Sequence, residues 1–293
     1  MRVLNFGSIN FDHVYRVDHL AKQGETVPSS DYAVYAGGKG ANQSVALARA
    51  GASVRHAGNI GPEGAWIKAK MAEAGVDVSA VRVLESRGGH AIVQVARDGH
   101  NAIVIYGGAN LEVTPEQIAE AFEGFGKGDF LLVQNEISHV PEIIQAAKDR
   151  GMTVCFNPSP MTPEVQRYPL KMVDLMILNH GEGAALAGVG PPNQIVAALA
   201  QRYEAEVIIL TLGSDGCMGR RKDRAFSAPA QPVAKVVDTT AAGDTFIGYF
   251  VAAYSRGLRL EDCAQEGTVA AAACIQRKGA MESIPLRKEL PLS

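Results

Sequence analysis

Short β-branched runs alternate with helical patterns along most of this chain, and this alternation limits the folds open to it. Residues 54–60 are predicted to form a strand, followed by an amphipathic helix over 63–74. The same order returns with a strand at 130–133, a helix at 141–150 and a strand at 153–156. Strands that alternate with helices predict a doubly wound α/β fold, with helices on both faces of a mostly parallel sheet.

Two segments interrupt the alternation. Residues 14–36 lack helical periodicity, and residues 81–106 carry β-like stretches with no helix between them. Asp98 and Gly99 lie between two of these stretches, which is a strong signal for a tight hairpin. We expect a small antiparallel sheet that serves as a lid or as an edge for dimer contact, with a plain surface hairpin as the alternative. No linker or repeat divides the chain, so residues 1–293 are predicted to form one domain.

The composition limits the partners and the compartment. Apolar residues make up 47% of the chain, which is enough for a large core, and the net charge of −3 argues against nucleic acid or an anionic membrane as the main partner. Cysteines are scattered without a CxxC pair, at 155, 217, 263 and 274, as expected for reduced thiols in a cytoplasmic protein. No apolar run approaches the ~18 residues of a membrane helix, and the N-terminus lacks the pattern of a signal peptide.

The stretch 237–246, Val-Asp-Thr-Thr-Ala-Ala-Gly-Asp-Thr-Phe, predicts the end of a strand, a turn of small residues and the start of a helix. Ala241, Ala242 and Gly243 do not shield their backbone N–H groups, which favours an anion at this helix N-terminus. Asp244 lies in the same turn, where its carboxylate could take a proton from a nucleophile attacking a bound phosphate. The alternative is an Asp that only stabilises its own helix.

A second glycine-rich stretch, Gly-Gly-Lys-Gly-Ala-Asn-Gln at 37–43, leads into a helix of small residues. It is not a P-loop, because the G-x-x-x-x-G-K-[ST] spacing is absent and Lys39 is followed by glycine. Glycines such as Gly38 let a polar ligand approach the backbone closely, and Lys39 and Asn42 supply hydrogen-bond donors.

Polar residues follow several predicted strands at their carboxyl ends, where α/β sheets bind ligands. Asn10 and Asp12 follow the first strand and could face a polar substrate, unless they only form an Asx turn. Right-handed crossovers would bring such strand ends to one edge of the sheet. The residues expected at that edge are Asn10, Glu136, Asn179, Gly213 and Asp238.

Several motifs together resemble the ribokinase (PfkB) family of sugar kinases. They are Gly-Ser-Ile-Asn-Phe-Asp at 7–12, the stretches at 37–43 and 238–246, Gly-Ala-Asn at 108–110, the Asn179-x-x-Glu182 spacing and Arg-Lys-Gly-Ala at 277–280. They follow the family's order over nearly the whole chain. The resemblance implies a three-layer α/β/α fold with a β-sheet lid, and transfer of the γ-phosphate of ATP to a sugar hydroxyl. In relatives the lid also forms a dimer contact, which implies a homodimer.

The resemblance also assigns roles to matching positions. Asp244 matches the catalytic base, and the amides of Ala241, Ala242 and Gly243 match the anion hole. The sugar-binding positions are Asn10, Asp12, Gly38, Lys39, Asn42, Glu136 and Asp244. The positions that bind ATP and Mg²⁺ are Asn179, Glu182, Thr211, Gly213, Gly216 and, at an adenine contact, Thr268. The monovalent-cation positions, which imply activation by K⁺, are Asp238, Thr240, Arg277, Gly279 and Ser283.

The loop that carries Lys39 favours the ribokinase subgroup, with D-ribose as acceptor and ribose 5-phosphate as product. Two departures leave the acceptor open: Gly-Gly-His at 88–90 replaces the usual Thr-Gly pair of a lid strand, and Thr268 replaces a common His or Asn. The alternatives are a kinase for fructose, a fructose phosphate, deoxyribose or a nucleoside, and a non-catalytic sugar sensor on the same fold. The presence of Asp244 argues against a sensor. A nucleotide-dependent oxidoreductase is opposed by the lack of a strand–GxGxxG–helix unit.

Overall fold

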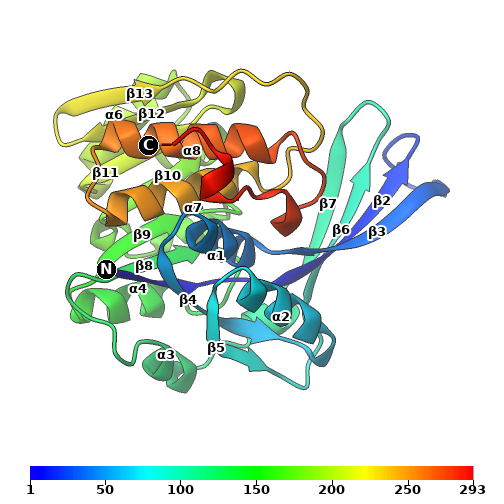
Figure 1. The fold of residues 1–293 in the computed structure, drawn as a ribbon, viewed down its shortest axis with the longest axis horizontal. Coiled ribbons are helices and arrows are strands. Elements are labelled where there is room, and N and C mark those ends of the chain that lie inside the picture. The colour runs from blue at the N-terminus through cyan, green and yellow to red at the C-terminus, as the bar shows by residue number, and fades with distance from the viewer. Residues whose placement is uncertain (293) are drawn as a thin grey trace.

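The middle layer of the molecule is a nine-stranded sheet, seen in a computed structural model that describes residues 1–292 (Figure 1). Its strands are β1 (Arg2–Phe6), β4 (Ser53–Ile60), β5 (Asp77–Val83), β8 (Phe130–Gln134), β9 (Thr153–Asn157), β10 (Leu175–Asn179), β11 (Val207–Thr211), β12 (Cys217–Arg221) and β13 (Arg224–Ala228). They are ordered β13-β12-β11-β10-β9-β8-β1-β4-β5. All neighbours from β11 to β5 are parallel, whereas β12 and β13 add an antiparallel hairpin at one edge. The predicted mostly parallel sheet is confirmed.

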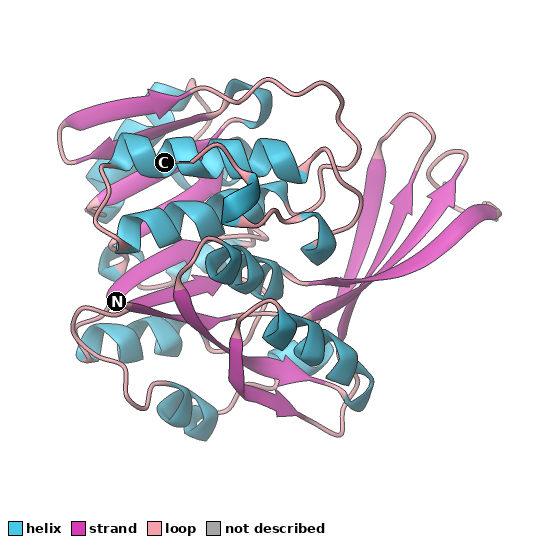
Figure 2. Cartoon of the chain, in the orientation of Figure 1, coloured by secondary structure: helices cyan, strands magenta, loops and turns pink. Residues whose placement is uncertain are grey.

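Helices cover both faces of this sheet (Figure 2). On one face lie α1 (Lys39–Arg49), α2 (Ala65–Glu73), α7 (Ala242–Ser255) and α8 (Leu260–Cys274). On the other lie α3 (Pro115–Ala121), α4 (Val140–Asp149), α5 (His180–Ala187) and α6 (Pro192–Tyr203). Short 3-10 helices lie in the connections: η1 (Pro62–Gly64), η2 (Gly108–Leu111), η3 (Pro163–Arg167), η4 (Leu170–Met172), η5 (Gly213–Asp215), η6 (Met281–Ser283) and η7 (Arg287–Glu289). No helix within residues 1–292 is long and apolar enough to cross a bilayer.

A separate four-stranded sheet projects from the helix-covered body, and it contains the segments that were predicted to form the lid, so it is called the lid below (Figures 1 and 2). Its strands are β2 (Asn10–Val17), β3 (Ser29–Gly37), β6 (Gly89–Val95) and β7 (Asn101–Tyr106), in the order β3-β2-β6-β7. The predicted hairpin at Asp98 and Gly99 is confirmed: β6 and β7 pair antiparallel, and Gly99 has a φ of 89°. The lid is not wholly antiparallel as predicted, because β2 and β6 pair in parallel.

The lid begins at different residues than the sequence predicted. Its first segment starts at Asn10 rather than at residue 14, so Asn10 and Asp12 lie on lid strand β2 and not at the end of β1. Its second segment starts at Gly89 rather than at residue 81, because β5 pairs in parallel with β4 in the central sheet. The connection from β5 to the lid contains no helix, so no change of sequence pattern marks this boundary.

The stretch before α7 also differs from its prediction. Residues 229–241 contain no strand, so Asp238 does not lie at a strand end. The backbone N–H groups of Val237 and Asp238 donate instead to the Ile275 carbonyl at the end of α8, at 2.8 and 3.2 Å. Val236 and Val237 are 52% and 41% exposed. Their β-branched side chains favour a strand locally, but no neighbouring strand is present to pair with them.

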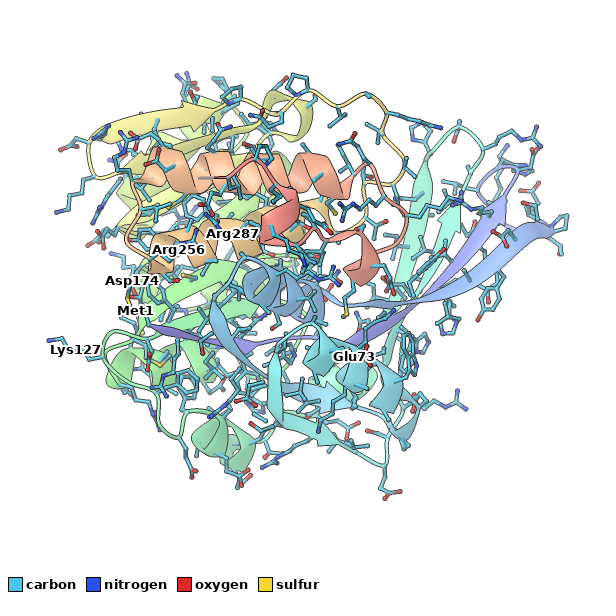
Figure 3. The ribbon with its side chains drawn as sticks, in the orientation of Figure 1. Met1, Glu73, Lys127, Asp174, Arg256 and Arg287 are labelled. Atoms are coloured by element: carbon cyan, nitrogen blue, oxygen red, sulfur yellow. The ribbon has the colours of Figure 1, made fainter. Side chains whose placement is uncertain are left out.

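A buried carboxylate attaches the C-terminal segment to the helical layer. Glu266 on α8 is 5% exposed and accepts from Arg256 at 2.6 Å and Arg287 at 2.5 Å. Figure 3 shows these two arginines close together beside α7 and α8. A buried carboxylate requires such partners, because removing one would leave an uncompensated charge.

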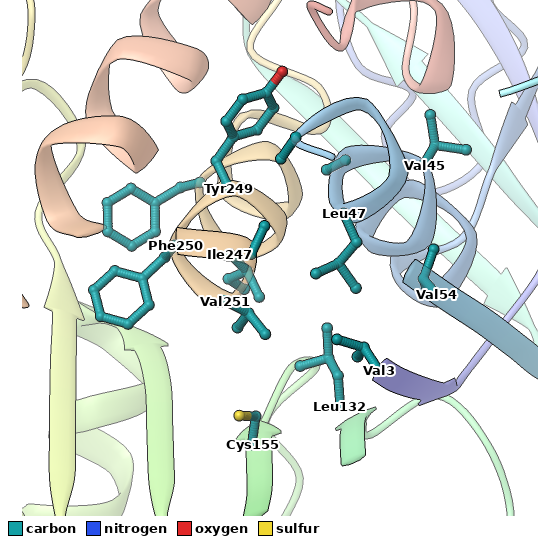
Figure 4. Close-up of a cluster of buried hydrophobic side chains, with 14 of the residues drawn as sticks. Val3, Val45, Leu47, Val54, Leu132, Cys155, Ile247, Tyr249, Phe250 and Val251 are labelled. Carbon is teal, nitrogen blue, oxygen red and sulfur yellow. The ribbon is translucent and has the colours of Figure 1, made fainter. Parts of the chain in front are cut away.

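The core that supports the site lies between α7, α1 and the sheet (Figure 4). Tyr249, Phe250 and Val251 on α7 are fully buried, and Leu47 on α1 packs in the same cluster. A Cβ on Gly248 of α7 would lie 2.3 Å from the Ala46 Cβ, so glycine allows α1 and α7 to approach closely. This contact joins the middle of α7 to the middle of α1. All four cysteines are buried and free.

Candidate active site

A pocket of about 180 Å³ opens at the carboxyl edge of the sheet, beside the N-terminus of α7. Its lining includes Asn157, Asn179 and Thr211, at the ends of β9, β10 and β11. Eight of the predicted site residues line it: Lys39, Asn179, Glu182, Thr211, Ala241, Ala242, Gly243 and Asp244. The structure therefore brings together residues as far apart in sequence as Lys39 and Asp244, as expected for strand ends in an α/β fold.

The N-terminus of α7 presents free backbone donors to this pocket. Ala241 has a φ of 60°, and its carbonyl accepts the Thr245 N–H at 2.8 Å, which starts the helix. Among residues 1–292, the N–H groups of Ala241, Gly243 and Asp244 have no acceptor. The Ala242 N–H was expected to be free as well, but it donates to the Thr239 carbonyl at 3.3 Å. Free N–H groups at the positive end of a helix favour an anion.

The Asp244 carboxylate is held at both oxygens by the first turn of α1. Asn42 Nδ2 donates to Oδ2 at 3.0 Å, and Gln43 Nε2 donates to Oδ1 at 2.9 Å. The helix can begin here because Gly38 has a φ of 92° and a Cβ on Gly40 would lie 2.5 Å from the Ser8 backbone nitrogen. The glycines of the 37–43 stretch thus bring the α1 amides within reach of Asp244.

Charged groups gather on the lid side of Asp244. Burial lowers the pKa of the Lys39 ammonium, but the surrounding carboxylates, Asp244 and Glu136 first among them, raise it above its usual range. Burial, with Glu136 and Asp244 nearby, raises the pKa of Asp12 to about 7, against the opposing charge of Lys39. Burial also raises the pKa of Glu136, which accepts the Lys39 backbone N–H at 3.2 Å. These groups offer both donors and acceptors to a polyhydroxyl ligand.

Asn10 is oriented by a residue to which the sequence assigned no role. Asn110 Nδ2 donates to Asn10 Oδ1 at 2.7 Å, and Asn110 Oδ1 accepts the Ile9 N–H at 3.0 Å. A Cβ on Gly89 would lie 2.0 Å from Asn110 Nδ2, so glycine at this lid position leaves room for the pair. Asn110 belongs to the Gly-Ala-Asn stretch at 108–110, which was the available signal.

Asn179 and Glu182 form a reciprocal cap at the start of α5. Asn179 Oδ1 accepts the Glu182 N–H, and Glu182 Oε2 accepts the Asn179 N–H, both at 2.9 Å. No group of three His, Cys, Asp or Glu side chains that could bind a metal occurs within residues 1–292. Mg²⁺ often uses one or two carboxylates together with water and substrate phosphates, and Glu182 in this pocket fits that pattern.

The nucleotide positions are brought together only in part. Thr211 lines the pocket, and Gly213 and Gly216 lie in the following turn, where the Leu212 N–H donates to the Gly216 carbonyl at 2.8 Å. Thr268 does not line the pocket: it is buried in α8, and its hydroxyl donates to the Gln265 carbonyl at 3.0 Å. The sequence placed Thr268 at an adenine contact, but here its hydroxyl is used within its own helix.

The predicted cation residues lie together behind α7. Asp238 accepts from the Thr240 hydroxyl at 2.6 Å and from the Gly279 N–H at 3.2 Å. Ser283 is fully buried and lies 3.0 Å from Cys274 Sγ, which in turn contacts the Thr240 carbonyl. The Arg277 guanidinium points to Glu289 at 2.9 Å, so only its backbone carbonyl could serve as a ligand. Oxygen donors of this kind suit a hard cation such as K⁺.

The family model for pfkB carbohydrate kinases matches residues 2–287. The chain belongs to this family. It is therefore an ATP-dependent sugar kinase with the fold of that family. A ribokinase from Haemophilus influenzae is 35% identical over 97% of this chain and 95% of its own length, and one from Staphylococcus aureus is 33% identical over 99% and 98%.

Solved structures of ribokinases superpose over almost the whole chain. The ADP complex of a Cryptococcus neoformans ribokinase has a TM-score of 0.88 at 34% identity and covers 98% of both chains. The ribose and ATP complex of an Arabidopsis thaliana ribokinase has a TM-score of 0.87 at 31% identity and covers 98% of this chain and 96% of its own. The predicted fold class is confirmed, including the separate small sheet.

Proposed function

We propose that this pfkB kinase transfers the γ-phosphate of ATP to the 5-hydroxyl of D-ribose and releases ribose 5-phosphate and ADP. The observation that carries this proposal is the position of Asp244, between free N–H groups and the cluster of Asp12, Lys39 and Glu136. The similarity to curated ribokinases over the whole chain supports ribose as the acceptor.

In the proposed reaction Asp244 takes the proton of the sugar hydroxyl. The hydroxyl oxygen forms a bond to the γ-phosphorus, the bond from that phosphorus to the β–γ bridging oxygen breaks, and ADP leaves with the electron pair. The free N–H groups of Ala241, Gly243 and Asp244 stabilise the charge on the transferring group. Asn10, Asp12, Gly38, Lys39, Asn42 and Glu136 bind the sugar in this proposal.

Two cations complete the proposed site. Asn179 and Glu182 would orient Mg²⁺, which neutralises phosphate charge when it is bound with ATP, and Thr211 would contact the nucleotide. Asp238, Thr240, Ser283 and the backbone of 277–279 would bind K⁺ behind the anion site. We place the enzyme in the cytoplasm, because ATP is present there and the reducing environment keeps the four buried free thiols of the enzyme reduced.

A coupled ADP-release assay tests the proposed substrate. With a panel of pentoses, hexoses, fructose 6-phosphate and nucleosides, we expect the highest kcat/KM for D-ribose, with faster turnover in K⁺ than in its absence. A preference for fructose, its phosphate or a nucleoside would reject ribose but retain a sugar kinase. If no compound of the panel is turned over while sugars bind in calorimetry, the sensor alternative replaces the kinase.

We propose that the lid also joins two copies of the chain. Its outer face carries exposed apolar side chains on strands β3, β6 and β7: Tyr32, Val34, Ile92, Val104 and Tyr106. His13 and Tyr15 of β2 lie between β3 and β6 on the same face, and cross-strand neighbours in this register join these side chains into one patch. A second copy would cover it without burying charged groups.

The lid contact predicts a change of oligomeric state on mutation. Val104 on β7 is 68% exposed. The variant Val104→Glu should be a monomer in sedimentation velocity where the wild type is a dimer, because dimerisation would bury an unpaired carboxylate. Val189, which is 98% exposed between α5 and α6, gives the matched control Val189→Glu, and this variant is expected to remain dimeric. A monomeric wild type at micromolar concentration would refute the contact.

A further inference from the structure

A buried chain of side-chain amides leads from the sheet to Asp244. Gln134, the last residue of β8, and Gln43, in the first turn of α1, are both fully buried. Gln134 Nε2 donates to Gln43 Oε1 at 2.6 Å, and Gln43 Nε2 donates to Asp244 Oδ1 at 2.9 Å. The proposed function gives no role to either glutamine.

The direction of this chain is fixed by its far end. Asn5 Nδ2 donates to the Gly40 carbonyl and to the Ser44 hydroxyl, both at 2.8 Å, so Asn5 Oδ1 must face Gln134. Gln134 Nε2 donates to that oxygen at 3.0 Å as well as to Gln43. The Gln43 amide therefore points its oxygen toward Gln134 and its NH₂ group toward Asp244. Turning it over would set donor against donor in a buried site, which costs free energy.

The two oxygens of Asp244 differ because of this arrangement. Asp244 Oδ1 accepts from Gln43 Nε2. Gln43 Nε2 also donates to Asn157 Oδ1 at 3.2 Å, and Gln43 Oε1 accepts from Gln134. Oδ2 is bound by Asn42, whose own Oδ1 is buried without a partner. Within residues 1–292, Asn42 is held by this one side-chain hydrogen bond, whereas the Gln43 amide is held by three, to Asp244, Asn157 and Gln134.

We propose that Gln43, held by Gln134, is a positioning residue for the general base: it fixes Asp244 Oδ1 toward the core and leaves Oδ2 to accept the sugar proton. This inference rests on the proposed function. A donated hydrogen bond stabilises the ionised form of a carboxylate. Gln43 therefore orients Asp244 without touching the sugar or ATP.

Gln43→Met, which keeps the side-chain length and removes the donor, tests the inference. At saturating ribose and ATP we expect kcat to fall about 10- to 100-fold, the size of one hydrogen bond to a charged group, while the KM for ribose changes less than about threefold. The pH at which kcat reaches half its plateau on the acidic side should rise by about one unit. Gln43→Glu should move it further, because two adjacent carboxylates share a proton.

Gln117→Met is the matched control. Gln117 on α3 is also buried, 2% exposed, and donates to Asn59 Oδ1 at 2.8 Å, but it makes no contact with Asp244. Its variant should lose comparable thermal stability and keep the wild-type pH profile. An equal shift of the acidic limb in both variants would overturn the inference, since the shift would then follow from destabilisation alone.

Gln134→Met tests the same series of hydrogen bonds one step further from Asp244, and it replaces Gln43→Met as the test if that variant does not fold. Gln134→Met should lower kcat less than Gln43→Met does, and it should move the acidic limb of the pH profile in the same direction. The double variant should have the kcat of Gln43→Met, because Gln134 acts through Gln43; additive losses would overturn the inference. If Asp244→Asn keeps full turnover, the proposed base itself is wrong. If Asp244→Asn is inactive but Gln43→Met keeps both kcat and pH profile, only this inference fails.

Discussion

Asp244→Asn is expected to lower kcat about 10³-fold, while the affinity for ribose measured by calorimetry changes less than about threefold. The variant lacks the general base that accepts the proton in the transition state, and such a base typically raises the rate by about 10²- to 10⁴-fold. The free N–H groups of Ala241 and Gly243 remain in this variant, so binding of ATP should persist. The measurement is steady-state ADP release beside isothermal calorimetry with ribose.

The Asn substitution carries a local cost that needs its own control. Asp244 accepts from Asn42 and Gln43, and an Asn offers one acceptor oxygen to two donors. Asp244→Ala removes the base without setting two donors against each other. Equal losses of kcat in both variants would assign the effect to the missing base. More than about a tenth of wild-type turnover in the Ala variant would contradict the role of Asp244.

The fold class could be predicted from the sequence because most strands of the central sheet have a residue pattern that differs from that of the helices. Runs such as residues 207–210 are apolar at every position, as required of strands buried on both faces. Pairing partners are a different matter. Residues 81–83 have the same β-branched pattern as the lid strands, and only the contact with β4 places them in the central sheet. Val236 and Val237 have a strand pattern, but no strand within residues 1–292 pairs with them.

Site residues could be predicted where the residue type and its position in a sequence motif indicate the function. Asp244 and Lys39 were singled out from their local patterns and Glu182 from the family resemblance, and all three line the pocket. The supporting contacts were not predictable in this way. Gln43 meets Asp244 across 201 positions of sequence, and neither residue's neighbours indicate the contact. The adenine contact expected of Thr268 stays a prediction; its hydroxyl donates within α8 and retains its oxygen as an acceptor.

Asp12 is predicted to bind ribose and to destabilise the free enzyme at the same time. Its pKa is raised to about 7 by burial and by the charges of Glu136 and Asp244, from 3.8 in the unfolded chain. Between these pH values the native state binds the extra proton, so stability falls as the pH rises from about 4 to 7 and stays reduced above 7. At about 1.4 kcal/mol per unit this is at most about 4 kcal/mol, and we expect about 2 because the side chain is only partly covered.

Asp12→Asn should therefore separate stability from binding. The variant should melt about 3–5 °C above the wild type at pH 8 and close to it at pH 4.5, since the removed charge exists only at the higher pH. Its ribose affinity should fall about 10²- to 10³-fold, the loss of two hydrogen bonds to a carboxylate. Thermal melts at both pH values and calorimetry at pH 8 provide the measurements.

Proton release gives the sharpest test of Asp12. Hydroxyl donors of a bound sugar favour the ionised carboxylate, so wild-type enzyme at pH 7 should release part of a proton when ribose binds. Calorimetry in two buffers of different ionisation enthalpy measures that release, and Asp12→Asn should abolish it. Glu25→Gln is the matched control, because Glu25 is a carboxylate near the lid that bonds His19 and lies outside the site. If Asp12→Asn keeps the proton release, or if it binds ribose as tightly as the wild type, then another carboxylate, with Glu136 the first candidate, contacts the sugar instead.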